Sequence, residues 1–166
     1  AGKADIIRSY GAVAIDRHNE NFVEIVRTQT NGRGVDHILD PIGGAHLKRS
    51  LSVLAQGGKL YTYGMSSAAP SSKRSLWKAL KALRSRPRFD PMLMMSRNQG
   101  VFGVHMGTWN DEGVMQEQMQ NILKGIKEGA LTPIIDSIYD AKDVAKAHQH
   151  IHDGKNIGKV LLKFVE

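Results

Sequence analysis

Three observations predict an α/β fold with a doubly wound parallel sheet. Stretches with helical spacing alternate with short apolar runs at the intervals typical of βα units, and these runs are too hydrophobic for strands with one face in water. The 166 residues are 41% hydrophobic and 23% charged, which suits one folded domain or slightly more. No apolar run approaches the roughly 20 residues that span a bilayer.

The first part of the chain predicts helices and strands in alternation. Residues 3–10 have helix-forming composition and end at Gly11, a favourable C-cap, while Asn19 can cap a second helix whose apolar side includes Phe22 and Ile25. The predicted strands here are residues 12–15, 35–39 and 59–63, with a third helix over 45–54, turns at 31–34 and 56–58, and loops at 40–44 and 64–67.

The pattern continues after a basic segment. A long helix over residues 112–128 ends at Gly129, and Pro133 marks the boundary at which the chain could leave one sheet and enter another. The apolar side of that helix is expected to face inward and consists of Met115, Met119, Ile122, Leu123 and Ile126. The remaining predicted elements are strands at residues 100–105, 134–139 and 158–165 and a helix at 141–152.

The net charge of +7 comes from one segment. Residues 73–97 contain eight basic residues and one acid, whereas the remaining 141 residues balance 15 basic against 15 acidic groups. Leucines recur within it at helical spacing, which predicts a basic amphipathic helix over residues 73–86. Such a helix can contact an anionic membrane or an acidic partner, or it can be an insertion with its leucines on the domain and its lysines in water. No nucleic-acid-binding motif accompanies it, so no nucleic-acid partner is expected.

Several catalytic fingerprints are absent from the sequence. There is no G-x-G-x-x-G loop for a dinucleotide pyrophosphate, because Gly32-Arg33-Gly34 precedes a strand and lacks the third glycine. A Walker A loop, a G-x-S-x-G elbow and a tyrosine with a lysine four residues later are also missing. Their absence disfavours P-loop, hydrolase and short-chain dehydrogenase functions.

The chain contains no cysteine. It therefore has no disulfide, no thiol nucleophile and no cysteine-ligated metal, and a cytoplasmic protein is expected. His148 and His152 would share one face of a helix, but neither a third ligand nor a metalloprotease glutamate accompanies them. We expect an exposed histidine-rich helix end and no metal site.

Four motifs occur in an order that resembles one enzyme family. They are K-A-D-I-I-R-S-Y-G-A at residues 3–12, N-G-R-G-V-D-H-I-L-D-P-I-G-G at 31–44, L-A-Q-G-G-K-L at 54–60 and D-G-K-N-I-G-K-V-L at 153–161. This order is similar to that of the zinc-independent quinone oxidoreductases of the medium-chain dehydrogenase/reductase superfamily. The basic insertion together with N-I-G-K is most similar to the vesicle amine transport protein branch.

The resemblance implies that the chain is a carboxy-terminal portion of a longer protein. Residues 1–132 would belong to a partial NAD(P)-binding Rossmann domain, and residues 133–166 would return to a GroES-like catalytic domain that the sequence lacks. The first strand and its glycine-rich loop would lie upstream, which would account for the missing fingerprint. Because the family forms dimers, a homodimer is expected.

The resemblance also implies contacts with a cofactor. In the family a lysine of the first helix contacts the 2′-phosphate of NADPH; Lys3 takes that place, and Arg17 stands where a phosphate-binding tyrosine often occurs. The two loops would line the ribose and nicotinamide, and a later strand would meet the carboxamide. These contacts are Asp40, Pro41, Ile42, Gly43, Gly64, Met65, Ser66, Phe102 and Val104. Alternatively, the two cations are solvated, the glycines form turns and Phe102 belongs to the core.

The function implied for the parent protein is that of an NADPH-dependent oxidoreductase. It would transfer hydride to a quinone or enone-like acceptor without zinc, and no catalytic residue is assigned within this portion. One alternative is a non-catalytic reductase-like module that binds an anionic membrane or acidic partner through residues 73–86. Another is a folded fragment without activity, which would be poorly stable alone because it exposes a sheet edge.

Overall fold

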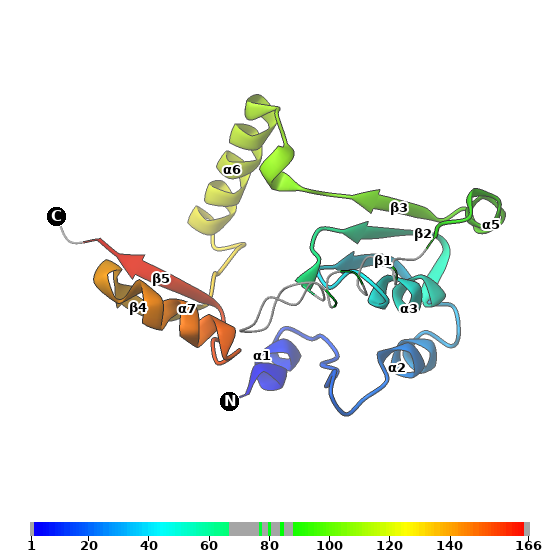
Figure 1. The fold of residues 1–166 in the computed structure, drawn as a ribbon, viewed down its shortest axis with the longest axis horizontal. Helices are drawn as coiled ribbons and strands as arrows, with labels where there is room; N and C mark the ends of the chain where they lie inside the picture. Colours follow the sequence, from blue (N-terminus) through cyan, green and yellow to red (C-terminus); the bar gives the residue numbers. More distant parts are fainter. Residues whose placement is uncertain (1, 67–76, 78–79, 81–83, 85–87, 165–166) are drawn as a thin grey trace. The chain divides into compact units, whose positions relative to one another are not determined.

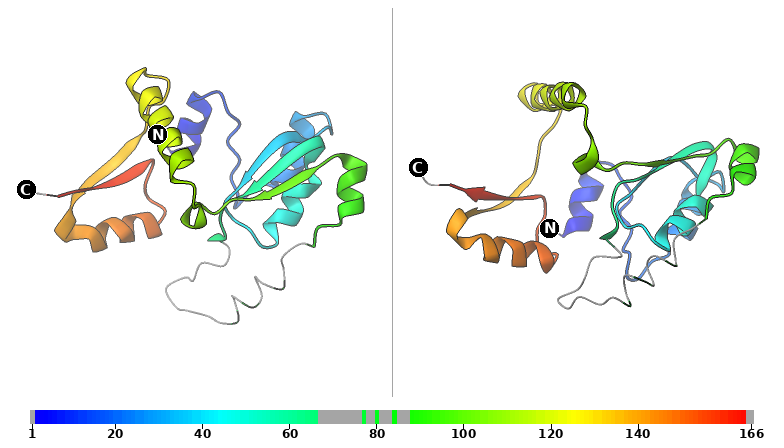
Figure 2. Two further views of the ribbon diagram at one scale, coloured as in Figure 1. Left: turned by 90° about the horizontal axis from the view of Figure 1, so that it is seen from above. Right: turned by 45° about the horizontal axis from the view of Figure 1, so that its top comes forward.

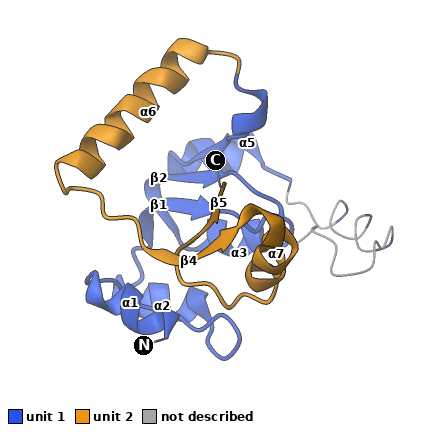
Figure 3. Ribbon diagram, turned by 90° about the vertical axis from the view of Figure 1, so that its left-hand side faces the viewer, with its two compact units in different colours: residues 1–109 blue, residues 110–166 orange. Residues whose placement is uncertain are grey.

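The computed structural model describes residues 2–66, 77, 80, 84 and 88–164, which form two compact units (Figure 3). The first unit comprises residues 1–109 and the second residues 110–166. Each contains its own parallel sheet. The domain boundary expected at residues 132 and 133 stays a prediction, because it concerns which domain of a longer protein each segment belongs to.

Three parallel strands form the sheet of the first unit in the order β1-β2-β3, and they lie side by side in every view (Figures 1 and 2). β1 spans Val35–Asp40, β2 spans Leu54–Thr62 and β3 spans Gly100–Gly103. Leu39 pairs with Tyr61, and Tyr61 pairs with Phe102, so the carboxyl ends of the strands lie at the same edge. The predicted parallel α/β class is confirmed.

Polar side chains fix the starts of two helices in this unit. Asn21 Oδ1 accepts a hydrogen bond from the Val23 amide at 3.2 Å, and Asp90 Oδ1 accepts one from the Met92 amide at 2.9 Å. Each side-chain oxygen accepts from an amide that a helix start leaves without a backbone acceptor. The helices of the unit that lie wholly within the described residues are α1 (Lys3–Ser9), α2 (Phe22–Gln29), α3 (His46–Ser52), α5 (Pro91–Arg97) and the 3-10 turn η2 (Met106–Thr108).

One face of the sheet carries the core of the first unit. Leu47 of α3 packs with Leu54 and Leu60 of β2, and the side chain of Leu60 has no exposed surface. Burying a leucine fully stabilises a fold by about 1.5–3 kcal/mol. Partly buried side chains that pack against this cluster are Ile38, Leu51 and Val101. The core thus fixes α3 against the strands whose ends carry the predicted loops.

The second unit contains a βαβ motif with two parallel strands. β4 (Ile135–Asp140) pairs with β5 (Lys159–Lys163), and the connection contains the 3-10 turn η3 (Ala141–Asp143) and α7 (Val144–His152). A long helix, α6 (Glu112–Lys127), precedes the motif. All of these elements were predicted from the sequence to within a few residues.

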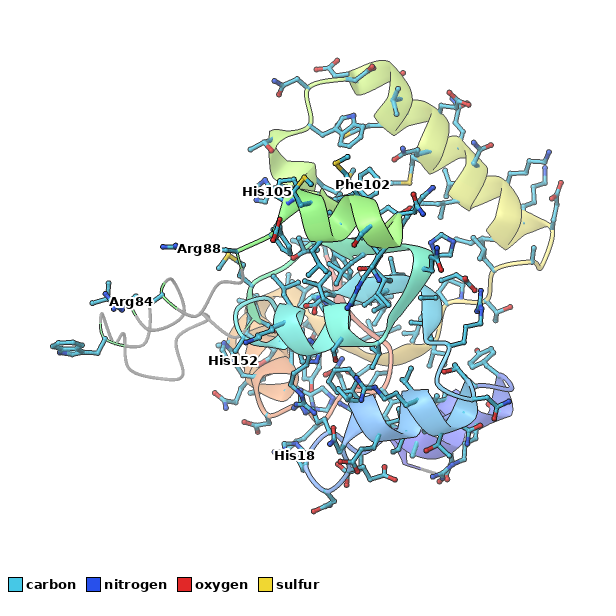
Figure 4. All side chains as sticks on the ribbon, turned by 90° about the vertical axis from the view of Figure 1, so that its right-hand side faces the viewer. His18, Arg84, Arg88, Phe102, His105 and His152 are labelled. Carbon is cyan, nitrogen blue, oxygen red and sulfur yellow. The ribbon has the colours of Figure 1, made fainter. Side chains whose placement is uncertain are left out.

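Asp136 joins the parts of this βαβ motif. Its Oδ1 accepts from the Ile157 amide at 2.7 Å, and its Oδ2 lies 2.8 Å from His150 Nε2. These two hydrogen bonds, with a third from the Ser137 hydroxyl, lower the pKa of Asp136. His150 is therefore a partner of Asp136, whereas His148 and His152 are exposed. Figure 4 labels His152.

Residues 12–15 do not form the predicted strand. They lie between α1 and α2 without regular secondary structure, and none of the described strands pairs with them. An apolar run becomes a strand only when a neighbouring strand accepts its backbone hydrogen bonds. The sequence shows the apolar run, but it does not show whether a neighbouring strand pairs with it.

Three further details differ from the sequence predictions. The cap of α2 is Asn21 rather than Asn19. Residues 56–58 lie inside β2, where the β1–β2 register shifts, rather than in a separate turn before it. The apolar side of α6 does not face inward among the described residues, since Met119, Ile122, Leu123 and Ile126 are all exposed. Helical spacing identifies an apolar face but does not show what covers it.

The basic amphipathic helix predicted over residues 73–86 lies mostly outside the described residues. Of that range only Trp77, Leu80 and Arg84 are described, and Trp77 is 81% exposed. Within the described part of the chain, no helix combines the length and the apolar character needed to cross a bilayer.

Candidate functional site

Two loops that follow adjacent strands meet at the carboxyl edge of the first sheet. The Tyr63 amide donates to the Asp40 carbonyl at 3.1 Å, and the Ser66 amide donates to the Pro41 carbonyl at 3.1 Å. Both strands are parallel, so their following loops emerge on the side where open α/β sheets bind ligands. The structure therefore brings together the predicted site segments 40–43 and 64–66.

Glycines allow the two loops to approach this closely. A Cβ on Gly64 would lie 2.6 Å from the Pro41 carbonyl oxygen, which is too short for a real contact. Gly43 has φ of +72°, and a Cβ there would lie 3.0 Å from the Gly64 carbonyl oxygen. Both positions need glycine for the loops to pack backbone against backbone.

Asp40 holds the first loop from beneath. Asp40 is 1% exposed, and its Oδ1 accepts hydrogen bonds from the amides of Ile42 and Gly43, both at 2.8 Å. Its Oδ2 lies 2.7 Å from His46 Nδ1 and 3.1 Å from Ser50 Oγ. Burial alone would raise the pKa of Asp40, but the hydrogen bonds, that from the Gly43 amide foremost, outweigh burial and lower it.

The Asp40 side chain bonds within the protein, and its expected contact with a cofactor stays a prediction. Both carboxylate oxygens are used inside the protein, so the side chain can act on a ligand by positioning the amides of Ile42 and Gly43. Further contacts link these side chains to α2. The His46 ring stacks on Phe22 at 5.0 Å, and the Arg49 guanidinium lies 4.5 Å from the centre of the same Phe22 ring. The loop is thus anchored to α2 as well as α3.

A hollow of about 760 Å³ lies beside the joined loops, at the ends of β2 and β3. Its volume falls in the range of small-molecule and cofactor sites. Val104 closes one side, and its amide donates to the Thr62 carbonyl at 2.9 Å, which extends the β2–β3 pairing by one residue. The hollow is lined by Thr62, Tyr63, Gly64, Met65, Gly103, Val104, His105, Thr108 and Trp109.

His105 lines the hollow although the sequence does not indicate it. The Thr108 hydroxyl donates to the His105 carbonyl at 3.1 Å, so its lone pair can accept from His105 Nδ1 at 3.2 Å. With Nδ1 donating to Thr108, Nε2 is the ring nitrogen that can accept a hydrogen bond. A lone histidine after a strand has no diagnostic spacing, and only the fold shows that it lines the hollow.

Phe102 lies on the sheet face opposite to the core. Its ring stacks on Tyr61 at 5.3 Å, and Tyr61 in turn stacks on His37 at 6.2 Å. Phe102 remains 46% exposed, so it is not a core residue of the described structure (Figure 4). Phe102 lies in β3 beside Gly103, but it does not line the hollow.

The two predicted phosphate ligands lie outside the joined loops. Lys3 is the first residue of α1, and Arg17 lies in a turn over residues 16–20. Asp16 shapes that turn by accepting from the His18 amide at 2.9 Å and from Asn19 Nδ2 at 2.6 Å, and Arg17 Nε lies 3.2 Å from His18 Nε2. Both cations are exposed, as contacts with a charged phosphate require.

The match to a family model covers most of the chain. Residues 10–162 match the family described as zinc-binding dehydrogenase. The chain belongs to this family, and its fold is the nucleotide-binding fold of medium-chain dehydrogenases and reductases.

Curated relatives extend the match. The chain is 29% identical over 164 residues to the synaptic vesicle membrane protein VAT-1 homolog of Rattus norvegicus, covering 98% of this chain and 40% of that protein. It is 24% identical over 159 residues to quinone oxidoreductase of Homo sapiens, covering 95% of this chain and 43% of that protein. The chain thus spans about 40% of the length of the relatives it matches.

Solved structures share the fold. The human VAT-1 homolog-like protein superposes with a TM-score of 0.68 at 22% identity, over 99% of this chain and 42% of that one. Alcohol dehydrogenase TADH from Thermus sp. ATN1 gives a TM-score of 0.71 at 21% identity, over 98% of this chain and 41% of that one. The resemblance to oxidoreductases of this superfamily that the sequence motifs indicated is confirmed.

The matched family is described as zinc-binding. The sequence has no cysteine, and nowhere in the described segments do three His, Cys, Asp or Glu side chains come together in a way that could hold a metal ion. The donor set described in this chain therefore does not form a zinc site.

Replacing Asp40 with asparagine tests its role as the anchor of the loop. Because the pKa of Asp40 is lowered by folding, its ionised form stabilises the fold above the unfolded value of about 3.9, and this contribution disappears as pH falls through the lower folded value. We expect Asp40→Asn to reduce the free energy of unfolding by about 1–3 kcal/mol at pH 7.

Urea unfolding of both proteins between pH 7 and pH 2 measures this effect. The difference in stability between wild type and Asp40→Asn should shrink toward the acid end, because protonated Asp40 loses the same interactions. A difference that is constant across the range would show that the charge of Asp40 does not stabilise the loop.

Proposed function

We propose that this chain forms one side of the cofactor site of an NADPH-dependent oxidoreductase that transfers hydride to a quinone or enone-like acceptor. The observation that carries the proposal is the pair of glycine-containing loops joined at the carboxyl edge of a parallel sheet, beside a hollow of about 760 Å³. Membership in a dehydrogenase family and the 24% identity to human quinone oxidoreductase support it.

Each part of the proposed site has a separate task. Loops 40–43 and 64–66 would present backbone groups to the ribose and nicotinamide, since their glycines remove side chains from that surface. When bound, the cofactor supplies the hydride, and the chain positions it. Val104 would meet the carboxamide, and His105 would line the hollow beside it.

The domain arrangement is part of the proposal. Residues 1–132 would form part of the nucleotide-binding domain, and residues 133–166 would join the catalytic domain of a whole enzyme, which would be a homodimer. The chain covers about 40% of the length of its relatives, which supports a whole enzyme in which other segments supply the rest of both domains.

Lys3 and Arg17 carry the proposed preference for NADPH over NADH. The 2′-phosphate is the group that distinguishes the two cofactors, and both a lysine and an arginine can bind it through charge-assisted hydrogen bonds. Lys3 lies at the start of α1, and Arg17 is held on the surface by the Asp16 turn.

A fluorescence titration of NADPH and NADH into the chain tests the proposal. We expect NADPH to bind more tightly, and Lys3→Ala or Arg17→Ala to weaken NADPH binding about tenfold each, because each removes a charge-assisted hydrogen bond. NADH binding should be unchanged in both variants. As a control, Lys163→Ala removes a cation of β5 outside the site and should leave both affinities intact.

Two results would count against the proposal. One is equal binding of NADPH and NADH by the wild-type chain. The other is a folded chain, verified by circular dichroism, that binds neither cofactor, which would contradict a half-site formed by these residues alone.

A second candidate function is favoured by the exposure of apolar side chains near the basic segment. Trp77 is 81% exposed, and Met92 and Met95 of α5 are 72% and 69% exposed. Arg84 and Arg88 lie in the same part of the sequence (Figure 4). Cations beside exposed apolar groups are typical of surfaces that contact anionic lipid. The name of the VAT-1 relatives describes those proteins as synaptic vesicle membrane proteins.

Co-sedimentation with vesicles tests this second function. We expect the chain to bind vesicles that contain phosphatidylserine and not vesicles of phosphatidylcholine alone, with binding lost at about 0.5 M salt because the Debye length shortens. Arg84→Glu with Arg88→Glu should weaken binding at least tenfold, at about 1 kcal/mol per removed cation. The matched double reversal Lys127→Glu with Lys163→Glu, in the second unit, should have little effect. No binding at low salt would exclude this function.

A further inference from the structure

A second cavity lies between α3 and α5 of the first unit, away from the proposed cofactor site. It has a volume of about 520 Å³ and is bounded by side chains of α3, of α5 and of residues 88–90 before α5. It shares no lining residue with the hollow at the ends of β2 and β3. A ligand here would therefore occupy a separate site.

The interior of this cavity is apolar. Its apolar lining consists of Leu51 of α3, Leu93 and Met94 of α5, and Phe89. Leu93 is 50% exposed and Phe89 39% exposed, so part of the apolar surface remains in contact with water. Covering such surface is favourable by about 25 cal/mol per Å².

The cavity has a positive rim. Lys48, Arg88 and Arg97 contribute to its lining, and none of them forms an ion pair with a carboxylate within the described segments. The single acid of the lining, Asp90, already accepts hydrogen bonds from the amides of Met92 and Leu93 as the cap of α5. The lining thus combines three cations with apolar side chains, and the carboxylate of Asp90 is already used to cap α5.

The backbone around the cavity is anchored, which makes it a preformed feature. Gln99 Nε2 donates to the carbonyls of Leu54 and Ala55 at 2.8 and 3.1 Å, and so ties the end of α5 to β2. Leu51 packs against the core cluster of Leu47 and Leu60. Both helices that form the cavity are therefore fixed to the same sheet.

We propose that the cavity between α3 and α5 binds a single-chain amphipathic anion of the fatty-acid class, with its alkyl chain against Leu51, Leu93 and Phe89 and its acidic head group at Lys48 and Arg97. The volume lies in the range of small-ligand sites, and an arginine matches the geometry of a carboxylate. A neutral or cationic amphipath would fill the same volume without using the charge of the rim.

Isothermal titration calorimetry with dodecanoate, kept below its micelle concentration, tests the site on the full chain. We expect one site with a Kd of about 0.1 mM, as a ligand of this size in a half-open cavity allows. Dodecanol and dodecyltrimethylammonium should bind at least about tenfold more weakly, and butanoate should show no measurable binding. Excess NADPH should not displace dodecanoate.

Variants locate the site. Lys48→Glu and Arg97→Glu should each weaken dodecanoate binding several-fold, and Leu93→Asp should abolish it. Lys127→Glu changes the net charge equally on α6 and should leave the Kd unchanged. Circular dichroism verifies that each variant is folded; Lys48 and Arg97 are both exposed, so neither reversal buries a charge.

Four results would overturn the proposal. Two are no binding of dodecanoate, and binding of dodecanol and dodecyltrimethylammonium as tight as that of dodecanoate. The others are displacement of dodecanoate by NADPH, and binding of the chain only to vesicles that contain fatty acid and not to free dodecanoate. The last would assign the cations to a lipid surface instead. Because the two sites share no residue, failure here would leave the cofactor proposal intact, and failure of NADPH binding would not change the result with dodecanoate.

Discussion

The buried carboxylate of Asp40 is the interaction on which the rest of the first unit depends. A charge with 1% exposure is unfavourable unless hydrogen bonds compensate for lost water, and four donors do so here. Two of these donors are amides of the loop after β1, and two are side chains of α3. One side chain therefore fixes the end of a strand, the shape of the loop and the position of the helix.

The consequences extend to both candidate sites. With the first loop held, the second loop can form its two backbone hydrogen bonds, and the glycines at positions 43 and 64 keep the contact free of side chains. On the other side, α3 presents Lys48 and Leu51 to α5 and so forms one wall of the second cavity. The cofactor proposal and the amphipath proposal thus rest on the same anchored helix, although they share no binding residue.

The sequence predicted the elements that depend on local pattern. β1, α3, β2 and the βαβ motif of the second unit follow from apolar spacing, turns and caps, and the structure has all of them. Residues 12–15 were wrongly expected to be a strand, and the apolar side of α6 was wrongly expected to face inward, because both expectations require a partner that local pattern cannot reveal. Sequence spacing alone shows an apolar run or face, not its neighbour.

The candidate site was predictable to a similar extent. The motif order placed both loops correctly along the chain, and the structure brings them together. The sequence did not show that Asp40 would be buried and hold its own loop, and its expected contact with a cofactor stays a prediction. His105 and the pairing with Thr108 carried no sequence signal, since a single histidine after a strand is uninformative until the fold places it beside a hollow.

A ¹⁵N–¹H NMR titration of the chain with NADPH tests most directly whether the loops form the cofactor surface. If the Asp40-anchored loops form the cofactor surface, chemical-shift changes will cluster at the amides of Ile42, Gly43, Gly64, Met65 and Val104. The changes will be much weaker at the same NADPH concentration in Asp40→Asn. Changes that are absent from these amides, or that map to α5 and residues 88–90, would contradict the claim that the Asp40-anchored loops form the cofactor surface.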